Sequence, residues 1–357
     1  MPEISRRNQV CCPNKPELLT LIVSACLAIC QAFKSKLNHR DTNANYNCLD
    51  DAGQYDLGGL FYRTMHLTIL YRGLLSSCNY GCEYCPFAKS AATAGELARD
   101  RQALVRFTDW IASQNDWDFS ILFTPWGEAL IHRWYQQALA QLSYLPNVRK
   151  VAIQTNLSGQ LDWLKLADAN TLAFWVTFHP EWADRQQFLS QCLTLDRLKF
   201  KFSVGMVGFT RFKAEIAALR ESLPAHIYLW INAVKRELPD LSPGDRDFFT
   251  QIDPLYPLNT QYYPAFGQYC RAGSSVISVD GDGTMRRCHF IKQPIGNIYD
   301  RNFAESLFDR PCTNQTCHCH IGYVHLDYLN LDQVFGAGIL ERIPVPSQPR
   351  SHQKPNV

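Results

Sequence analysis

The sequence predicts an α/β fold: a partial, six-stranded (β/α)6 barrel of the TIM type, followed by a small cysteine-rich extension built from a β-hairpin and a helix. Strand-like and helix-like hydrophobic patterns alternate six times between residues 65 and 240. The alternation fills about 170 residues, whereas a complete eight-fold barrel needs about 250. The cysteines of the ordered part fall mainly into two tight groups, one near the start of the alternation and one after its end.

The elements follow one another in a regular order. We expect strands over residues 66–71, 119–123, 150–155, 172–178, 199–207 and 227–234. We expect helices over residues 96–113, 134–145, 161–167, 185–195 and 211–223. Each return through a helix makes consecutive strands parallel. Ligands of parallel α/β folds collect at the carboxyl ends of the strands, so the chemistry is expected there.

Composition narrows the class of protein. The chain has 357 residues, with 35 Lys and Arg against 33 Asp and Glu, and this near balance argues against a nucleic-acid-binding surface. Hydrophobic residues make up 46%, enough for a sizeable core. A chain of this size does not need disulfide staples, so its 14 cysteines point to metal chemistry in a reducing, cytoplasmic compartment.

The first 64 residues lack a regular pattern. Their apolar stretch, residues 18–33, is 16 residues long, shorter than the roughly 20 of a membrane-spanning helix. We therefore expect no membrane anchor and a poorly structured extension outside the native fold, with a secretion signal as the alternative. The expected organisation is this extension over 1–64, the barrel over 65–240, the cysteine-rich domain over 241–330 and a tail over 331–357.

The loop after the first expected strand carries three cysteines, Cys78, Cys82 and Cys85, at x3 and x2 spacing. Three thiolates on one short loop can hold three corners of a [4Fe–4S] cube and leave the fourth iron open. A zinc site would need a fourth protein ligand nearby, and a ferredoxin would supply a fourth cysteine. Neither is present in the loop, which favours an open cluster.

This loop resembles the Cys-x3-Cys-x-aromatic-Cys signature of the radical SAM superfamily, in which Tyr84 would pack against the adenine of S-adenosylmethionine. Gly127 and Glu128 resemble the end of the family's Gly-Gly-Glu turn, which holds the cofactor's amino group, although Trp126 replaces the first glycine. Asn156 resembles the asparagine of its Thr-Asn turn. The resemblance implies that Tyr84, Gly127, Glu128 and Asn156 bind the cofactor.

The same resemblance implies a [4Fe–4S] cluster held by the three cysteines and S-adenosylmethionine. Reductive cleavage of the cofactor to a 5′-deoxyadenosyl radical, which abstracts hydrogen from a substrate, would follow. An external electron donor such as flavodoxin or ferredoxin is implied as well. Four side chains compete as partner of the cofactor's carboxylate: Lys201, Ser203, Lys235 and Arg236. His179, after the fourth strand, is either a structural histidine or a substrate contact.

The second cysteine group comprises Cys270, Cys288, Cys312, Cys317 and Cys319. An expected hairpin, residues 275–290, lies between the first two, and a helix is expected near 303–308. The group resembles the SPASM/twitch extension of radical SAM enzymes, which implies one auxiliary [4Fe–4S] cluster held by Cys270, Cys288, Cys317 and Cys319, with Cys312 as spare or substitute. A zinc site using His289, His318 or His320 is the alternative.

The substrate is not decided by sequence. Peptide or protein side chains are one possibility, since relatives of this type act as maturases, and a separate leader-binding protein would then be a partner. A small-molecule substrate is the alternative. Two alternative functions do not involve radical chemistry: a non-catalytic iron–sulfur electron carrier and a zinc-stabilised scaffold.

Overall fold

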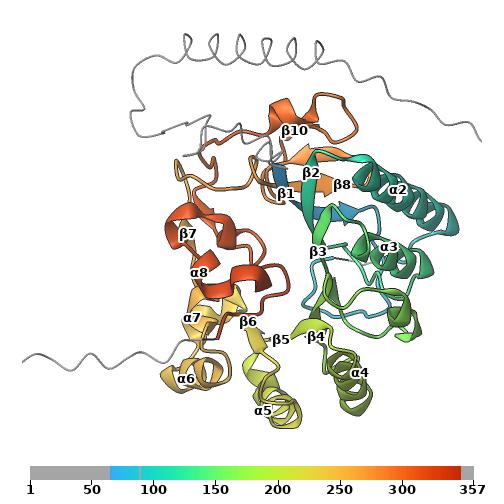
Figure 1. The fold of residues 1–357 in the computed structure, drawn as a ribbon. Helices are drawn as coiled ribbons and strands as arrows, with labels where there is room; N and C mark the ends of the chain where they lie inside the picture. Colours follow the sequence, from blue (N-terminus) through green and yellow to red (C-terminus); the bar gives the residue numbers. More distant parts are fainter. Residues whose placement is uncertain (1–64, 88–89, 347–357) are drawn as a thin grey trace, which may run out of the picture. The chain divides into compact units, whose positions relative to one another are not determined.

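The computed structural model describes residues 65–87 and 90–346, and the expected extension over residues 1–64 lies outside them. Six parallel strands form the barrel part of one sheet: β1 (Met65–Gly73), β2 (Trp117–Phe123), β3 (Val148–Thr155), β4 (Leu172–Phe178), β5 (Lys201–Val207) and β6 (Leu229–Asn232). They follow one another in spatial as well as chain order. The predicted α/β partial barrel is therefore confirmed (Figure 1).

Helical segments connect the strands and cover the outer face of the sheet. They are α2 (Ala94–Ser113), α3 (Arg133–Ser143), η1 (Asp162–Leu166), α4 (Arg185–Arg197), η2 (Thr210–Phe212) and α5 (Lys213–Ser222). The helix expected over 161–167 is instead the 3-10 segment η1, because five residues are too few to repay the cost of nucleating an α-helix. α2 begins at a capping box between Thr93 and Glu96.

The rest of the chain consists of short elements. They are η3 (Lys235–Asp240), α6 (Pro243–Ile252), α7 (Tyr256–Asn259), β7 (Tyr263–Pro264), β8 (Val276–Asp280), β9 (Thr284–Arg286), β10 (Pro294–Asn297), η4 (Phe303–Ser306), β11 (Thr316–Cys317), η5 (Tyr323–His325), η6 (Asp327–Leu329), α8 (Asp332–Phe335) and η7 (Gly336–Gly338). The helix expected near 303–308 is the single 3-10 turn η4.

The hairpin between Cys270 and Cys288 is not a separate layer. β8 pairs in parallel with β1, with Thr68 opposite Val276, and β9 and β10 continue the same sheet to nine strands. An open barrel leaves β1 with an unpaired edge, and β8 covers that edge. The cysteines that flank the hairpin are thereby fixed rigidly to the first barrel strand.

The inner face of the sheet is filled by the end of the described chain. Leu340 packs into a cluster with Trp175 and Trp230, and Lys150 Nζ donates to the buried carboxylate of Glu341 at 2.5 Å. Residues 331–346, which fall within the expected tail, include α8 and η7, and Leu340 covers part of the inner face because an incomplete barrel needs apolar side chains from elsewhere there. Residues 347–357 lie outside the described part.

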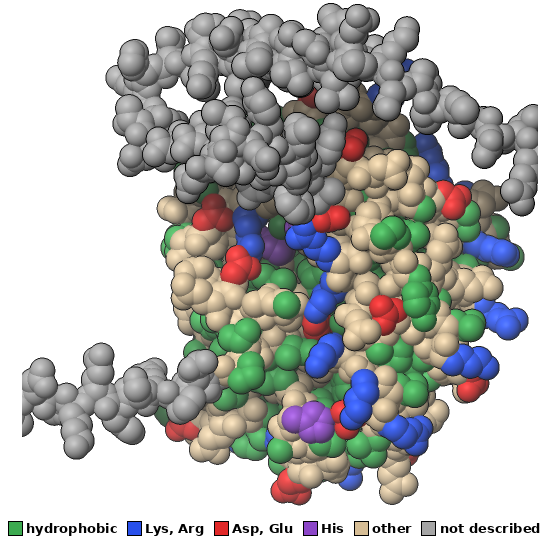
Figure 2. All heavy atoms as spheres, viewed as in Figure 1, with side chains coloured by type: hydrophobic (Ala, Val, Ile, Leu, Met, Phe, Trp, Pro, Cys, Tyr) green, Lys and Arg blue, Asp and Glu red, His purple; other side chains and the backbone are tan. Residues whose placement is uncertain are grey.

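The described helices include none that is long and apolar enough to cross a membrane. The apolar stretch over residues 18–33 is not among the described residues. Acidic and basic side chains both occur on the face shown in Figure 2, as the small net charge of +2 requires.

Candidate functional site

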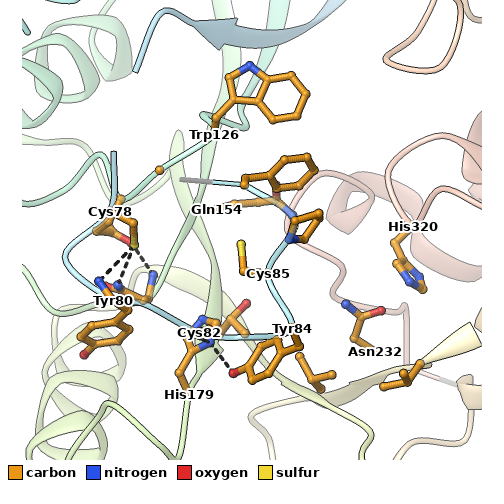
Figure 3. A pocket seen from close by; sticks show the side chains of 18 of the residues that line it. Cys78, Tyr80, Cys82, Tyr84, Cys85, Trp126, Gln154, His179, Asn232 and His320 are labelled. Atoms are coloured by element: carbon orange, nitrogen blue, oxygen red, sulfur yellow. Dashed lines mark hydrogen bonds between the residues drawn. The ribbon is translucent and has the colours of Figure 1, made fainter. Parts of the chain in front are cut away.

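A cavity of about 500 Å³ opens at the carboxyl ends of the barrel strands. Its lining includes the three cysteines of the first group and the four residues expected to bind the cofactor: Cys78, Cys82, Tyr84, Cys85, Gly127, Glu128 and Asn156. Figure 3 shows the loop of Cys78, Cys82 and Cys85 along one side of this cavity, with Asn232 and His320 across from it. The strand order thus brings together Cys78 and Asn156, which are 78 positions apart in the sequence.

The three-cysteine loop is anchored by polar contacts to its thiols. Cys78 Sγ accepts from the backbone N–H of Tyr80 at 3.4 Å, and Cys82 Sγ lies 3.4 Å from His179 Nδ1. Burial raises the pKa of both the Cys78 and the Cys82 thiol, because a desolvated thiolate is costly. A bound cationic metal reverses that preference, and thiolates are the ligands that iron–sulfur clusters use. The donor set therefore fits a cluster.

Tyr84 and His179 form a stacked pair beside the loop. Their rings are 6.0 Å apart at an angle of 7°, and the Tyr84 hydroxyl lies 2.8 Å from His179 Nδ1. Burial lowers the pKa of His179 to about 4, so the ring is neutral at pH 7. His179 therefore holds the loop against the end of β4.

Glu128 acts as a clamp, because its carboxylate joins the loop after β2 to the end of β3. Its carboxylate accepts from the backbone N–H of Asn156 at 2.6 Å, from Thr155 Oγ1 at 2.8 Å and from the backbone N–H of Leu130 at 2.9 Å. The side chain is only 3% exposed. Two of these hydrogen bonds join the residue that sequence resemblance assigned to the cofactor to the end of β3, and the third stays within its own loop after β2.

Gly127 is required by the close approach of two loops. A Cβ at this position would lie 1.7 Å from the carbonyl oxygen of Ser77, next to Cys78. The neighbouring Trp126 turns its indole onto the guanidinium of Arg72, 4.1 Å from the ring centre, and onto Phe87. Trp126 stands at the position of the first glycine of the Gly-Gly-Glu turn, but its side chain points to Arg72 and Phe87. It therefore leaves free the space between Gly127 and Ser77.

The structure distinguishes between the four side chains that were expected as partners of the cofactor's carboxylate. Lys235 and Arg236 line the cavity, whereas Lys201 is exposed elsewhere and Ser203 Oγ donates to the carbonyl of Glu341. Lys235 Nζ donates to the carbonyls of Asn259 at 2.6 Å and Gln261 at 2.7 Å. Burial lowers its pKa to about 8.

Arg236 keeps its hydrogen-bonding capacity. Within the described residues its guanidinium contacts only the ring of Phe209, at 5.9 Å. An arginine lining a cavity with all five N–H groups available suits a carboxylate or phosphate. Arg236 is therefore the better placed of the two cations for an anionic ligand.

The cavity is also lined by polar side chains that sequence reasoning did not assign to it, among them Gln154, Thr177, Asn232 and His320. Asn232 Oδ1 and His320 Nδ1 are buried and have no hydrogen-bond partner in the described part of the chain. Asn232 could have been found as the last residue of β6. His320 lies here rather than with the second cysteine group, which removes it from the set of residues that a zinc site there could use.

The second cysteine group lines a separate cavity of about 320 Å³. All five thiols border it: Cys270, Cys288, Cys312, Cys317 and Cys319, together with His289, His318 and His325. Burial raises the pKa of Cys270 to about 11 and of Cys317 to about 12. Among the described residues no three His, Cys, Asp or Glu side chains converge closely enough to hold a single metal ion.

No protein-family model matches the chain, and no curated protein matches it. Solved structures of anSMEcpe match the chain. The structure of anSMEcpe with bound AdoMet and the Kp18Cys peptide has a TM-score of 0.47 and is 13% identical, and the match covers 68% of this chain and 81% of anSMEcpe. BtrN in complex with AdoMet and 2-DOIA has a TM-score of 0.35 and 16% identity over 67% and 85%. These structural neighbours are radical SAM enzymes. At such identity the likeness concerns the fold, and a function has to be argued from the cavities.

Proposed function

We propose that this chain is a radical SAM enzyme. The observation that carries the proposal is the placement of Cys78, Cys82 and Cys85, which face a cavity at the carboxyl ends of parallel barrel strands with no fourth cysteine in its lining. A [4Fe–4S] cluster with S-adenosylmethionine on its open iron supplies, when bound, the 5′-deoxyadenosyl radical that abstracts hydrogen from a substrate.

The chain's own residues hold and orient that pair. Cys78, Cys82 and Cys85 ligate the cluster, and the contact between Tyr84 and His179 holds their loop to the end of β4. Arg236 is the partner for the cofactor's carboxylate, because it lines the cavity and its guanidinium has no hydrogen-bond acceptor among the described residues. Gly127 allows the loop after β2 to run directly against the cysteine loop, which shields the site from water.

The second cavity is the proposed site of one auxiliary [4Fe–4S] cluster, with Cys270, Cys288, Cys317 and Cys319 as ligands and Cys312 as spare or substitute. Five thiols around a single cavity support a cluster, which is held by thiolates spaced around its corners. For the alternative zinc site, His289 and His318 of the three expected histidines line this cavity, and His325 lines it as well.

The substrate is proposed to be a peptide or protein side chain, with a small molecule as the alternative. The cavity is lined by neutral polar groups from three strand ends, Gln154, Thr177 and Asn232, which suits amide and hydroxyl groups of either class. In the cytoplasm, the electron that reduces the cluster would come from a donor protein such as flavodoxin or ferredoxin. A non-catalytic electron carrier is the remaining alternative.

The test is release of 5′-deoxyadenosine from S-adenosylmethionine. The full chain is reconstituted anaerobically with iron and sulfide, reduced with dithionite and compared with a Cys78/Cys82/Cys85→Ala triple variant. Release by the native chain that is lost in the variant supports the enzyme. An iron-loaded protein that releases none, alone or with candidate peptides and small molecules, would favour the electron carrier.

A further inference from the structure

Arg72 lies between the two cavities. It is the penultimate residue of the barrel strand β1, is 7% exposed and donates from Nη1 to the carbonyl of Thr124 at 2.8 Å. Its guanidinium stacks on Trp126, which lines the first cavity, and its Nε donates to Nδ1 of His289 at 2.9 Å. His289 lines the second cavity. One side chain thus connects the loop beside the first cysteine group to the wall of the second.

The contact with Arg72 determines which nitrogen of His289 carries a proton. A guanidinium N–H can only donate, so Nδ1 must offer its lone pair and carries no hydrogen. The hydroxyl of Ser278 lies 2.9 Å from the same nitrogen and can donate to it as well. The ring is therefore the neutral tautomer with its hydrogen on Nε2.

The Nε2–H group of His289 has no partner among the described residues, although it is buried. Burying a donor without an acceptor is costly, and such groups in native proteins usually point to a ligand or water that completes them. The cavity that His289 borders is the one surrounded by five thiols. Sulfur is therefore the acceptor that a filled cavity would offer.

We propose that His289 is a hydrogen-bond donor to the sulfur atoms of the auxiliary cluster and not a metal ligand, and that Arg72 is the positioning residue that fixes its tautomer. The inference rests on the auxiliary cluster of the proposed function. Ligation through Nε2 would require the proton to move to Nδ1, where it would face the N–H of Arg72. A hydrogen bond to cluster sulfur stabilises the reduced, more negative form and raises its reduction potential.

The test is a potentiometric titration of the full chain carrying Cys78/Cys82/Cys85→Ala, so that only the second cavity can hold a cluster. Reduced cluster is followed by electron paramagnetic resonance. His289→Phe is expected to lower the ratio of reduced to oxidised cluster about tenfold at a fixed potential, a midpoint shift of about 59 mV, because the hydrogen bond that it removes is stronger to the reduced cluster than to the oxidised one. His289→Gln should restore most of the ratio, because its amide can donate.

Two variants keep the test decisive. Arg72→Met retains the histidine and should lower the potential in the same direction but less, because Ser278 still donates to Nδ1. His226→Phe is the control: this histidine is exposed, lies 2.9 Å from Asp196 and lines neither cysteine cavity, so its loss should leave the potential unchanged. Hyperfine spectra should show an exchangeable proton at the cluster that disappears in His289→Phe.

The outcomes separate the inference from the function on which it rests. An unchanged potential in His289→Phe, with iron and sulfide at the level of the parent, overturns the hydrogen bond and leaves the cluster in place. Loss of iron from His289→Phe and His289→Gln alike would show that His289 is a ligand. Zinc, or no iron, in the parent overturns the auxiliary cluster itself, together with the inference.

Discussion

Glu128 offers the sharpest test of how the first site is built, because sequence resemblance and structure assign it different tasks. Resemblance makes it a contact of the cofactor, whereas the structure shows a carboxylate that accepts two hydrogen bonds from the end of β3 and one from its own loop. A residue that only binds the cofactor should not affect unfolding of the empty protein. A clamp should.

The magnitude follows from the three donors. In Glu128→Gln the amide oxygen can still accept from Thr155 Oγ1 and the backbone of Leu130, but its NH2 group then faces the N–H of Asn156. One unsatisfied buried donor costs about 1–3 kcal/mol. Burial also raises the pKa of Glu128, so removing its charge offsets part of this cost and about 1–2 kcal/mol remains. Glu128→Ala leaves all three donors without an acceptor and should cost about 3 kcal/mol or more.

The assay is urea unfolding of the full chain without metal or cofactor, followed by tryptophan fluorescence. Both variants should lower the midpoint at constant slope, with Ala lower than Gln. Glu181→Gln is the matched control, because Glu181 is exposed and its carboxylate is 3.6 Å from Arg211; it should change stability by less than about 0.5 kcal/mol. Wild-type unfolding of both Glu128 variants, combined with lost binding of S-adenosylmethionine, would refute the clamp.

Three further perturbations test other parts of the first site. Gly127→Ala should abolish 5′-deoxyadenosine release while the protein stays folded, because the new Cβ, 1.7 Å from the Ser77 carbonyl, must displace the cysteine loop; retained activity would contradict this. Arg236→Met should weaken binding of S-adenosylmethionine about tenfold or more in calorimetry, the loss expected for a charge-assisted hydrogen bond; unchanged affinity would exclude Arg236 as partner. Burial lowers the pKa of His179 to about 4 and of His320 to about 3, below the ordinary 6.5. Their neutral forms therefore stabilise the fold fully above about pH 6.5, and this stability is lost as the pH falls towards 4 and 3. The urea midpoint should fall as the pH is lowered over that range, and it should fall less in His179→Phe than in the unchanged chain. An equal fall in both proteins would show that burial of neutral His179 does not contribute to the pH dependence.

Most of the barrel could be predicted from local pattern. The strand over 172–178 has the predicted bounds, and α2 begins two residues before its predicted start, because a buried strand and an amphipathic helix leave a period in the sequence. The 3-10 segment η1 could not be told from an α-helix, since both bury apolar residues at nearly the same spacing. The parallel pairing of β8 with β1 is a contact between segments about two hundred residues apart and leaves no local signal.

The site shows the same division. Cys78, Cys82 and Cys85 lie within one loop, so the sequence alone predicts that the three thiols are neighbours and motivates the hypothesis of an open cluster. Only the tertiary structure decided that Glu128 clamps two strand ends, that Arg236 and not Lys201 faces the cavity, and that Arg72 sets the tautomer of His289, 217 positions away. The physical reason is that spacing along the chain determines contacts only within one turn or loop, whereas the direction of a side chain and the partner that it finds depend on which strands the sheet places side by side.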